Sequence, residues 1–212
     1  MTKTTAPAAF ELHGGHPALD FVNTLDNRFR EDGPVELLES YDDLLRFLQQ
    51  TKLLGAQQAT LLVGAVQKGA AVWVLQSVRE LREATASTLY SAVEGRPPAA
   101  ADIRALEQYF LGANRHRQLR WLPSPGSSSE RWGASWVWGR FESDVELPVW
   151  ILAQAASDLL TSNELDRVRT CGSETCRWLF LDTSKNHTRR WCNMKTCGNR
   201  MKARRFHARR LG

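Results

Sequence analysis

Apolar positions recur with helical spacing through most of the first 160 residues. Ala18, Phe21, Val22 and Leu25 follow one another at i, i+3, i+4 and i+7, which predicts a short helix with one buried face. Ser40 is the expected N-cap of a longer helix, because two aspartates follow it in the first turn. The same periodicity predicts helices over residues 40–54, 56–67, 70–93, 97–113 and 148–160.

The period changes to two between residues 117 and 139. RQLRWL and WGASWVWG flank the turn-rich segment PSPGSSSER, which predicts a β-hairpin. Trp132, Trp136 and Trp138 share one face of the second strand, and we expect that face to be buried. The alternative is an effector pocket. In that case Trp136 and Trp138 line the pocket, and Asn23 and Thr24 supply polar groups from the side of the first helix opposite its apolar face.

Charge is distributed unevenly along the chain. Residues 1–166 carry 15 Lys and Arg against 21 Asp and Glu. Residues 167–212 carry 13 Lys and Arg against two acids, Glu174 and Asp182. A compact basic segment behind an acidic body indicates a polyanionic partner.

Several classes of protein are disfavoured by what the sequence lacks. No run of 18 or more apolar residues occurs, so we expect no membrane span. The first 21 residues lack a basic region followed by an apolar stretch, which favours the cytoplasm over secretion. No nucleophile–base arrangement, P-loop or dinucleotide fingerprint is present, so we expect that the protein is not an enzyme.

All four cysteines lie in the basic segment, with the spacing Cys171-x4-Cys176-x15-Cys192-x4-Cys197. Two short-spaced pairs about 15 residues apart fit a four-thiolate zinc site. The competing explanations are thiol redox chemistry, two disulfides, which seldom persist in the cytoplasm, and four unrelated buried thiols, which would not explain the regular pairing. A segment of about 45 residues also needs more than its own core to fold. We therefore expect one structural zinc per chain, with an apolar strand, a turn and a second short strand between the pairs.

This segment resembles the CGNR zinc finger found at the end of bacterial proteins described as stress-induced transcription regulators. The resemblance lies in Cys171, Cys176, the WLFLD stretch, the RRWC run and CGNR at residues 197–200. Upstream, ALDFVNTL followed by helices and a hairpin is similar to the ABATE domain of the same family. The resemblance implies that the four cysteines bind zinc and that the finger binds DNA.

Basic residues surround and follow the second cysteine pair. If metal anchors that pair, residues 198–210 are expected to form a short helix, with Met201 and Phe206 packed on the finger. Phosphate contacts are then expected from nine residues: Arg189, Arg190, Lys195, Arg200, Lys202, Arg204, Arg205, Arg209 and Arg210. A solvated cationic tail is the simpler alternative. An RNA- or ribosome-associated protein using the same finger is another, since the preference for duplex DNA rests on the resemblance.

These features predict an α+β chain of two domains. The first, residues 1–165, is mainly helical with one hairpin, and it is expected to sense a small effector or to form a homodimer. The second, residues 166–212, is a four-cysteine zinc finger that is treble-clef-like or ribbon-like.

Overall fold

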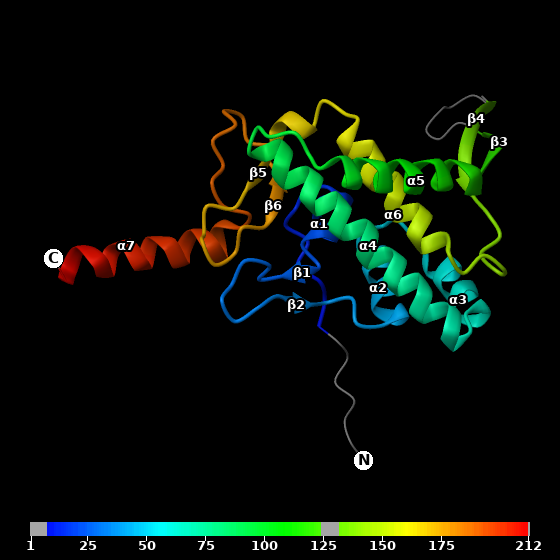
Figure 1. The fold of residues 1–212 in the computed structure, drawn as a ribbon, viewed down its shortest axis with the longest axis horizontal. Helices are drawn as coiled ribbons and strands as arrows, with labels where there is room; N and C mark the ends of the chain where they lie inside the picture. Colours follow the sequence, from blue (N-terminus) through cyan, green and yellow to red (C-terminus); the bar gives the residue numbers. More distant parts are fainter. Residues whose placement is uncertain (1–7, 124–131, 212) are drawn as a thin grey trace, which may run out of the picture.

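The computed structural model describes residues 8–123 and 132–211 of the 212-residue chain. Its fold is α+β, with helices dominating and strands occurring as separate antiparallel pairs (Figure 1). All the helices that periodicity predicts before residue 165 are present. In chain order, the α-helices are α1 (Pro17–Val22), α2 (Tyr41–Gln50), α3 (Ala56–Ala65), α4 (Lys68–Val93), α5 (Ala100–His116), α6 (Leu147–Leu160) and α7 (Asn199–Leu211).

Each described strand has one antiparallel partner. The pairs are β1 (Leu25–Asp26) with β2 (Val35–Glu36), β3 (Arg117–Pro123) with β4 (Trp132–Trp138), and β5 (Val168–Thr170) with β6 (Leu179–Leu181). The β3–β4 pair confirms the expected hairpin, whose turn at residues 124–131 lies outside the described residues. Periodicity does not predict β1, β2 or β5, because two or three residues are too few to show alternation. Leu25 therefore begins β1 instead of extending the buried face of α1.

The body is built around α4, the longest helix (Figure 1). α5 and α6 pack along it and against each other, and α2 contacts both α4 and α6. Their shared core contains the fully buried side chains of Phe47, Leu81 and Leu147. None of the described helices is long and apolar enough to cross a membrane.

The expected cap of α2 is confirmed in detail. Ser40 Oγ accepts a hydrogen bond from the Asp43 backbone N–H at 3.1 Å, and Asp43 Oδ2 accepts one from the Ser40 N–H at 3.0 Å. This reciprocal pair satisfies two amides that an uncapped helix leaves without partners. Ser40 and Asp43 thus fix where the helix begins.

The expectation of a buried tryptophan face on the β3–β4 hairpin is wrong. Trp132 and Trp136 are each 55% exposed, and Trp121 on the facing strand is 67% exposed. The hairpin extends beyond the end of α5, and no other described element pairs with either of its strands (Figure 1). Only its base is covered, where Trp138 is half-buried and the Arg117 guanidinium lies 5.9 Å from the ring centroid.

The segment after residue 165 packs directly on the body. The Asn23 side chain donates to the Leu179 carbonyl at 2.9 Å and accepts from the Leu179 N–H at 3.0 Å. The Leu181 N–H donates to the Gly14 carbonyl at 2.7 Å. Val168, Leu179 and Leu181 join a core cluster with buried residues of α1, α4 and α6. The loop before α1 and the C-terminal end of α1 therefore contact one edge of β6.

Candidate metal centre and nucleic-acid interface

The turn between β5 and β6 carries the first cysteine pair. Cys171 follows β5, and its N–H donates to the Trp178 carbonyl at 2.8 Å, which extends the β5–β6 ladder past the strand ends. Arg177, just after the second cysteine of the pair, has a left-handed backbone with φ of 54°. The chain thus reverses within a few residues and directs both thiols to one side. The strand partner of the WLFL stretch is β5, which precedes the cysteines; the expected strand after the stretch is absent from the described residues.

The second pair lies at the start of the C-terminal helix. Cys192 precedes the π-helical turn η2 (Met194–Gly198), which contains Cys197 and leads directly into α7. A Cβ atom on Gly198 would lie 2.4 Å from Met194 Sδ, so a larger residue there displaces the exposed Met194 side chain. One pair on a hairpin turn and one at a helix start make the finger treble-clef-like, since a ribbon would need a second hairpin.

The four sulfur atoms form a compact cluster, all within 4.8 Å of one another. Cys192 Sγ lies 3.6 Å from Cys176 Sγ and 3.7 Å from Cys197 Sγ. A tetrahedral zinc ion with Zn–S bonds of about 2.3 Å places its sulfurs about 3.8 Å apart, whereas a disulfide needs about 2.05 Å. All four cysteines lie in the described part of the chain, and none forms a disulfide. They can hold one metal ion, and their spacing fits zinc.

The electrostatics of the cluster also favour a cation. Hydrogen bonds with the thiols of Cys176 and Cys192 lower the pKa of Cys171 to about 2, and backbone amides assist. The contacts with Cys171 raise the pKa of both Cys176 and Cys192 above that of a free thiol. Ionisation of the Cys171 thiol thus makes ionisation of the Cys176 and Cys192 thiols less favourable. Several thiolates coexist there only when a metal ion supplies positive charge.

Arg189 is half-buried against this centre. Its guanidinium lies 4.5 Å from the centroid of the Phe180 ring and donates to the carbonyls of Trp191 and Cys192. Its backbone N–H donates to Asp182, whose carboxylate is fully buried. The expectation that Arg189 contacts nucleic acid is therefore corrected, because its hydrogen-bonding groups are used to hold the loop before Cys192. Arg190, its neighbour, is exposed beside the Trp191 ring.

This difference between neighbours gives a paired prediction. Arg189→Gln removes donors that fix the Cys192 carbonyl, so zinc affinity is expected to fall by about 10- to 100-fold, as when other supports of metal ligands are lost. Arg190→Gln is expected to leave zinc affinity unchanged, because its side chain is exposed. Competition against a zinc chelator measures both. Equal zinc affinities in the two variants would contradict the structural role of Arg189.

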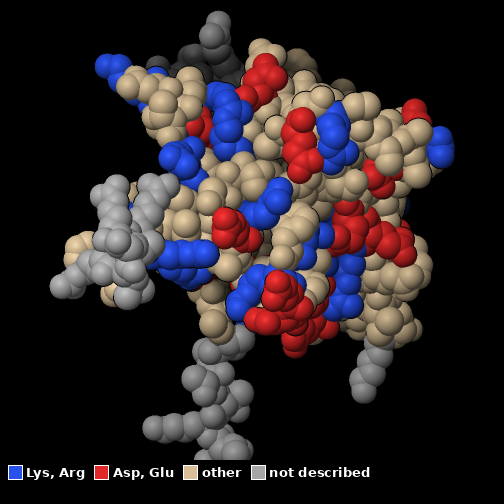
Figure 2. Space-filling view, turned by 60° about the vertical axis from the view of Figure 1, so that its left-hand side comes forward, with Lys and Arg blue, Asp and Glu red and all other residues tan. Residues whose placement is uncertain are grey.

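α7 extends away from the body beyond the cysteine cluster (Figure 1). Lys202 and Arg204 on it are exposed, as is Lys195 in η2. Met201 is half-buried, but Phe206 is 57% exposed, so the expectation that it is buried against the finger is wrong. Figure 2 shows several basic side chains on the left of the view, with a few acidic ones between them. The backbones of Arg205, Arg209 and Arg210 belong to α7, but their side chains lie outside the described residues.

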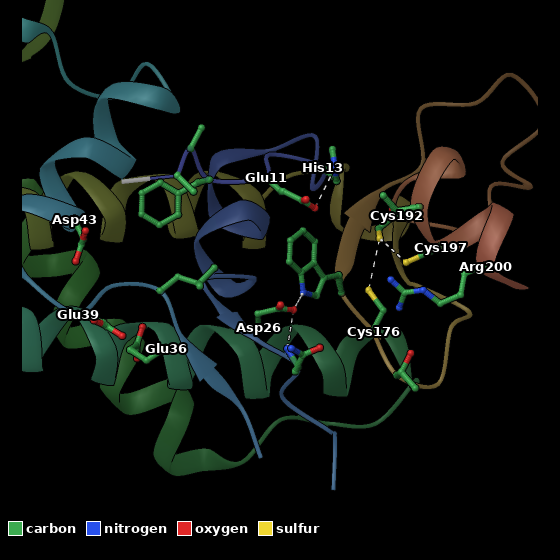
Figure 3. A pocket seen from close by; sticks show the side chains of 18 of the residues that line it. Glu11, His13, Asp26, Glu36, Glu39, Asp43, Cys176, Cys192, Cys197 and Arg200 are labelled. Carbon is green, nitrogen blue, oxygen red and sulfur yellow. Dashed lines mark hydrogen bonds and ion pairs between the residues drawn. The ribbon is translucent and has the colours of Figure 1, made fainter. Parts of the chain in front are cut away.

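Arg200 differs from the other basic residues of α7. It lines a cavity of about 570 Å³ together with Cys176, Cys192 and Cys197, and Figure 3 shows its side chain turned toward them. Four thiolates around one Zn²⁺ carry a net charge of about −2, which a nearby guanidinium offsets. Although Arg200 is exposed, it is suited to balancing the charge of the metal centre.

Carboxylates line the other side of that cavity (Figure 3). Asp26 Oδ1 accepts from the Trp178 indole N–H at 2.7 Å, which ties β1 to the finger. Burial raises the pKa of Glu36, but the Arg82 guanidinium outweighs it, and the net shift is downward. The remaining lining carboxylates are those of Glu11, Glu39 and Asp43. Carboxylates thus predominate on this side of the cavity, although Arg46 lies among them.

The structure does not assemble the effector pocket expected from Asn23, Thr24, Trp136 and Trp138. Asn23 and Thr24 are 4% and 2% exposed, and both use their polar groups internally. Asn23 holds Leu179, while the Thr24 hydroxyl donates to Phe21 and accepts from Arg82. The hairpin with both tryptophans lies at the other end of the body from the finger to which Asn23 binds (Figure 1). The position of Asn23 in the sequence predicts a free polar side chain, whereas in the structure that side chain is hydrogen-bonded to Leu179 of the finger.

Comparison with protein-family models gives two adjoining matches. Residues 15–163 match the model ABATE, described as "Putative stress-induced transcription regulator". Residues 167–210 match the CGNR zinc finger, a segment that contains all four cysteines. Neither description names a catalytic activity. No curated protein matches the chain.

Proposed function

The chain belongs to the ABATE family and carries a CGNR zinc finger, and on that premise we propose that it is a transcription regulator that binds duplex DNA through α7. Cys171, Cys176, Cys192 and Cys197 are the zinc ligands in this proposal. Zinc bound by four thiolates serves as a cross-link and leaves no coordination position for substrate. The four cysteines around the zinc ion then hold the start of α7 against the β5–β6 turn.

The observation that carries this proposal is the exposed, cationic helix that leaves the metal centre. α7 has 13 residues and is therefore about 20 Å long, and it extends away from the body (Figure 1). Its one ion pair among the described side chains joins Arg204 to Glu174 at 3.4 Å, and both side chains are largely exposed. Such a pair contributes little to stability, so Arg204 exchanges it for a phosphate at small cost.

The shape of α7 favours duplex DNA over duplex RNA. The major groove of B-DNA is about 12 Å wide and admits a helix, whereas the major groove of A-form RNA is deep and narrow. Lys195, Lys202 and Arg204 then contact phosphates, with Arg190 beside them. Arg205, in the middle of α7, and Arg209 and Arg210, near its end, complete a set that neutralises about six phosphates, for which the log–log salt slope is about −5.

Selection of bound sites from random duplex DNA tests this function. We expect enrichment of one sequence motif and, for that motif, a salt slope of about −5. In a second experiment, structured RNA competes with the selected duplex for the protein. If RNA displaces the selected duplex at equal or lower concentration, the DNA proposal fails, and an RNA- or ribosome-associated role replaces it.

We further propose that the body in front of the finger senses a small effector. The support for this is the direct contact between the two parts. Val168, Leu179 and Leu181 of the finger share a core cluster with helices of the body, so a change in helix packing reaches the finger strands without crossing a linker.

A further inference from the structure

One face of the β3–β4 hairpin is apolar and open to solvent, at the end of the molecule opposite α7 (Figure 1). Directly opposed residues of an antiparallel pair share a face, so the register shows which side chains lie together. The apolar face consists of Leu119, Trp121, Pro123, Trp132, Ala134 and Trp136. All of them are exposed. A sheet with an apolar face normally buries it against another layer, and this hairpin has no such layer among the described residues.

The other face of the hairpin is mainly polar. Gln118, Arg120 and Ser135 lie there, with Leu122 toward the tip. The Arg120 guanidinium donates to Gln118 Oε1 at 3.1 Å, so these polar groups already interact with each other. An isolated two-stranded hairpin is at best marginally stable in water. A second layer on the apolar face alone would supply the missing burial and leave the polar face in water.

The exposed part of the apolar face carries no charge. Arg117 shares this face but lies at its base, where its guanidinium is 5.3 Å from the Trp136 ring centroid and donates to Gln154 Oε1 at 2.8 Å. A nucleic-acid strand stacked on the rings would need free cations beside them to hold its phosphates. A charged protein surface would leave its own charges buried without partners. The occupant that fits is therefore an apolar, uncharged protein surface.

A second copy of the chain presents such a surface, namely the same hairpin face. In a two-fold dimer each copy contributes the same patch, and an uncharged patch does not repel its copy. Leu119 and the three tryptophans are each between 55% and 67% exposed, which leaves roughly 500 Å² of their surface in water when a whole tryptophan has about 150–250 Å². Two copies would bury about 1,000 Å² from these side chains alone, which is the area that a specific interface needs.

We propose that the chain forms a two-fold dimer in which the apolar faces of two β3–β4 hairpins pack on each other. Sheets packed face to face lie about 10 Å apart, so the tryptophans of the two copies interdigitate between them. α7 lies at the opposite end of the molecule, so both α7 helices stay free (Figure 1). One consequence rests on the proposed function: two α7 helices related by a two-fold axis bind two half-sites, and the selected DNA motif is then palindromic.

The same charge placed on opposite faces of the hairpin tests this interface. Trp121→Glu puts a carboxylate in the middle of the apolar face, whereas Ser135→Glu puts one on the polar face, directly opposite Arg120. Sedimentation velocity of the full zinc-loaded chain, in a reducing buffer that excludes disulfide-linked dimers, measures both. Wild type and Ser135→Glu are expected to be dimers at micromolar concentration. Trp121→Glu should weaken dimerisation by about 100-fold or more, because a buried interface tryptophan is worth about tenfold or more and the change enters a two-fold interface twice.

Two further variants guard against misfolding and non-specific effects. Trp136→Ser removes a ring without adding a charge, and it should also weaken the dimer by about tenfold or more. Trp73→Glu makes the Trp121 substitution at a tryptophan of α4 that is 51% exposed, and it should leave the dimer intact. Zinc content and circular dichroism equal to those of wild type show that each variant folds.

Three results overturn the interface. They are a wild-type chain that stays monomeric throughout the micromolar range, a dimer that Trp121→Glu and Trp136→Ser leave intact, and a dimer that Ser135→Glu or Trp73→Glu weakens equally. Vesicles of phosphatidylcholine and phosphatidylglycerol provide a fourth: a monomeric chain that binds them through Trp121 assigns the face to a membrane instead.

Sedimentation without DNA separates this inference from the proposed function. A dimer that depends on Trp121 in a chain that binds no duplex DNA supports the interface and overturns the proposed function. Duplex DNA binding by a chain that is monomeric throughout the micromolar range overturns the interface alone.

Discussion

Replacing Cys197 by serine is expected to reduce bound zinc from one ion per chain to almost none and to abolish binding to duplex DNA. Cys197 lies in η2, so it is the ligand that joins the metal centre to the start of α7. Losing a thiolate from a structural zinc site removes most of an apparent folding energy on the order of 10 kcal/mol. Without that cross-link, α7 no longer has a fixed direction. Metal analysis and DNA titration of the same sample measure both effects.

Thr196→Ala is the matched control for this substitution. Thr196 precedes Cys197, is exposed and carries no metal-binding thiol, so its loss should leave zinc and DNA binding intact. If Cys197→Ser retains one zinc and wild-type DNA affinity, the four-thiolate assignment is wrong. Loss of zinc with full DNA binding would keep the metal site but separate it from recognition.

Truncation after Asn199 is expected to leave zinc bound and to lower affinity for duplex DNA by about 10³-fold or more at moderate salt. All four cysteines precede the cut, whereas the exposed basic part of α7 follows it. The salt slope should fall from about −5 to about −2, because Arg190 and Lys195 are the main cations left beside the site. Titrations at several salt concentrations give affinity and slope together.

A charge-only variant controls for the missing helix. Lys202→Gln with Arg204→Gln keeps the length of α7 and should reduce the slope by about two, one for each lost phosphate contact. Affinity should fall alike for all duplex sequences, since phosphate contacts carry no sequence information. Undiminished affinity in the truncated chain would remove α7 from any role in binding.

Local patterns in the sequence predict much of this structure. The spacing of the cysteine pairs predicts the thiol cluster because each pair lies within one turn, where chain geometry leaves few alternatives. Ser40 and Asp43 predict the start of α2 for the same reason. The helices before residue 165 follow from apolar periodicity, which burial in a shared core requires.

Contacts between distant segments could not be predicted in this way. Arg189 has the same residue type and surroundings in sequence as Arg190, and only the folded chain places its guanidinium on the Phe180 ring. The tryptophans of β4 alternate as a buried strand does, but alternation does not show whether another layer covers the face. The interaction of Asn23 with Leu179 joins residues 156 positions apart, and no local pattern contains it.

That separation has a consequence for how the protein is made. During synthesis, residues 13–24 leave the ribosome long before β6, and the surface that receives the finger exists before the finger does. Until β6 emerges, the Asn23 amide and the Gly14 carbonyl lack the backbone partners that Leu179 and Leu181 provide. Cys192 and Cys197 follow the whole body in the chain, so the zinc site is completed only after the body has been synthesised. Under zinc shortage we therefore expect chains whose body is complete but whose cysteine-bearing end lacks its metal cross-link.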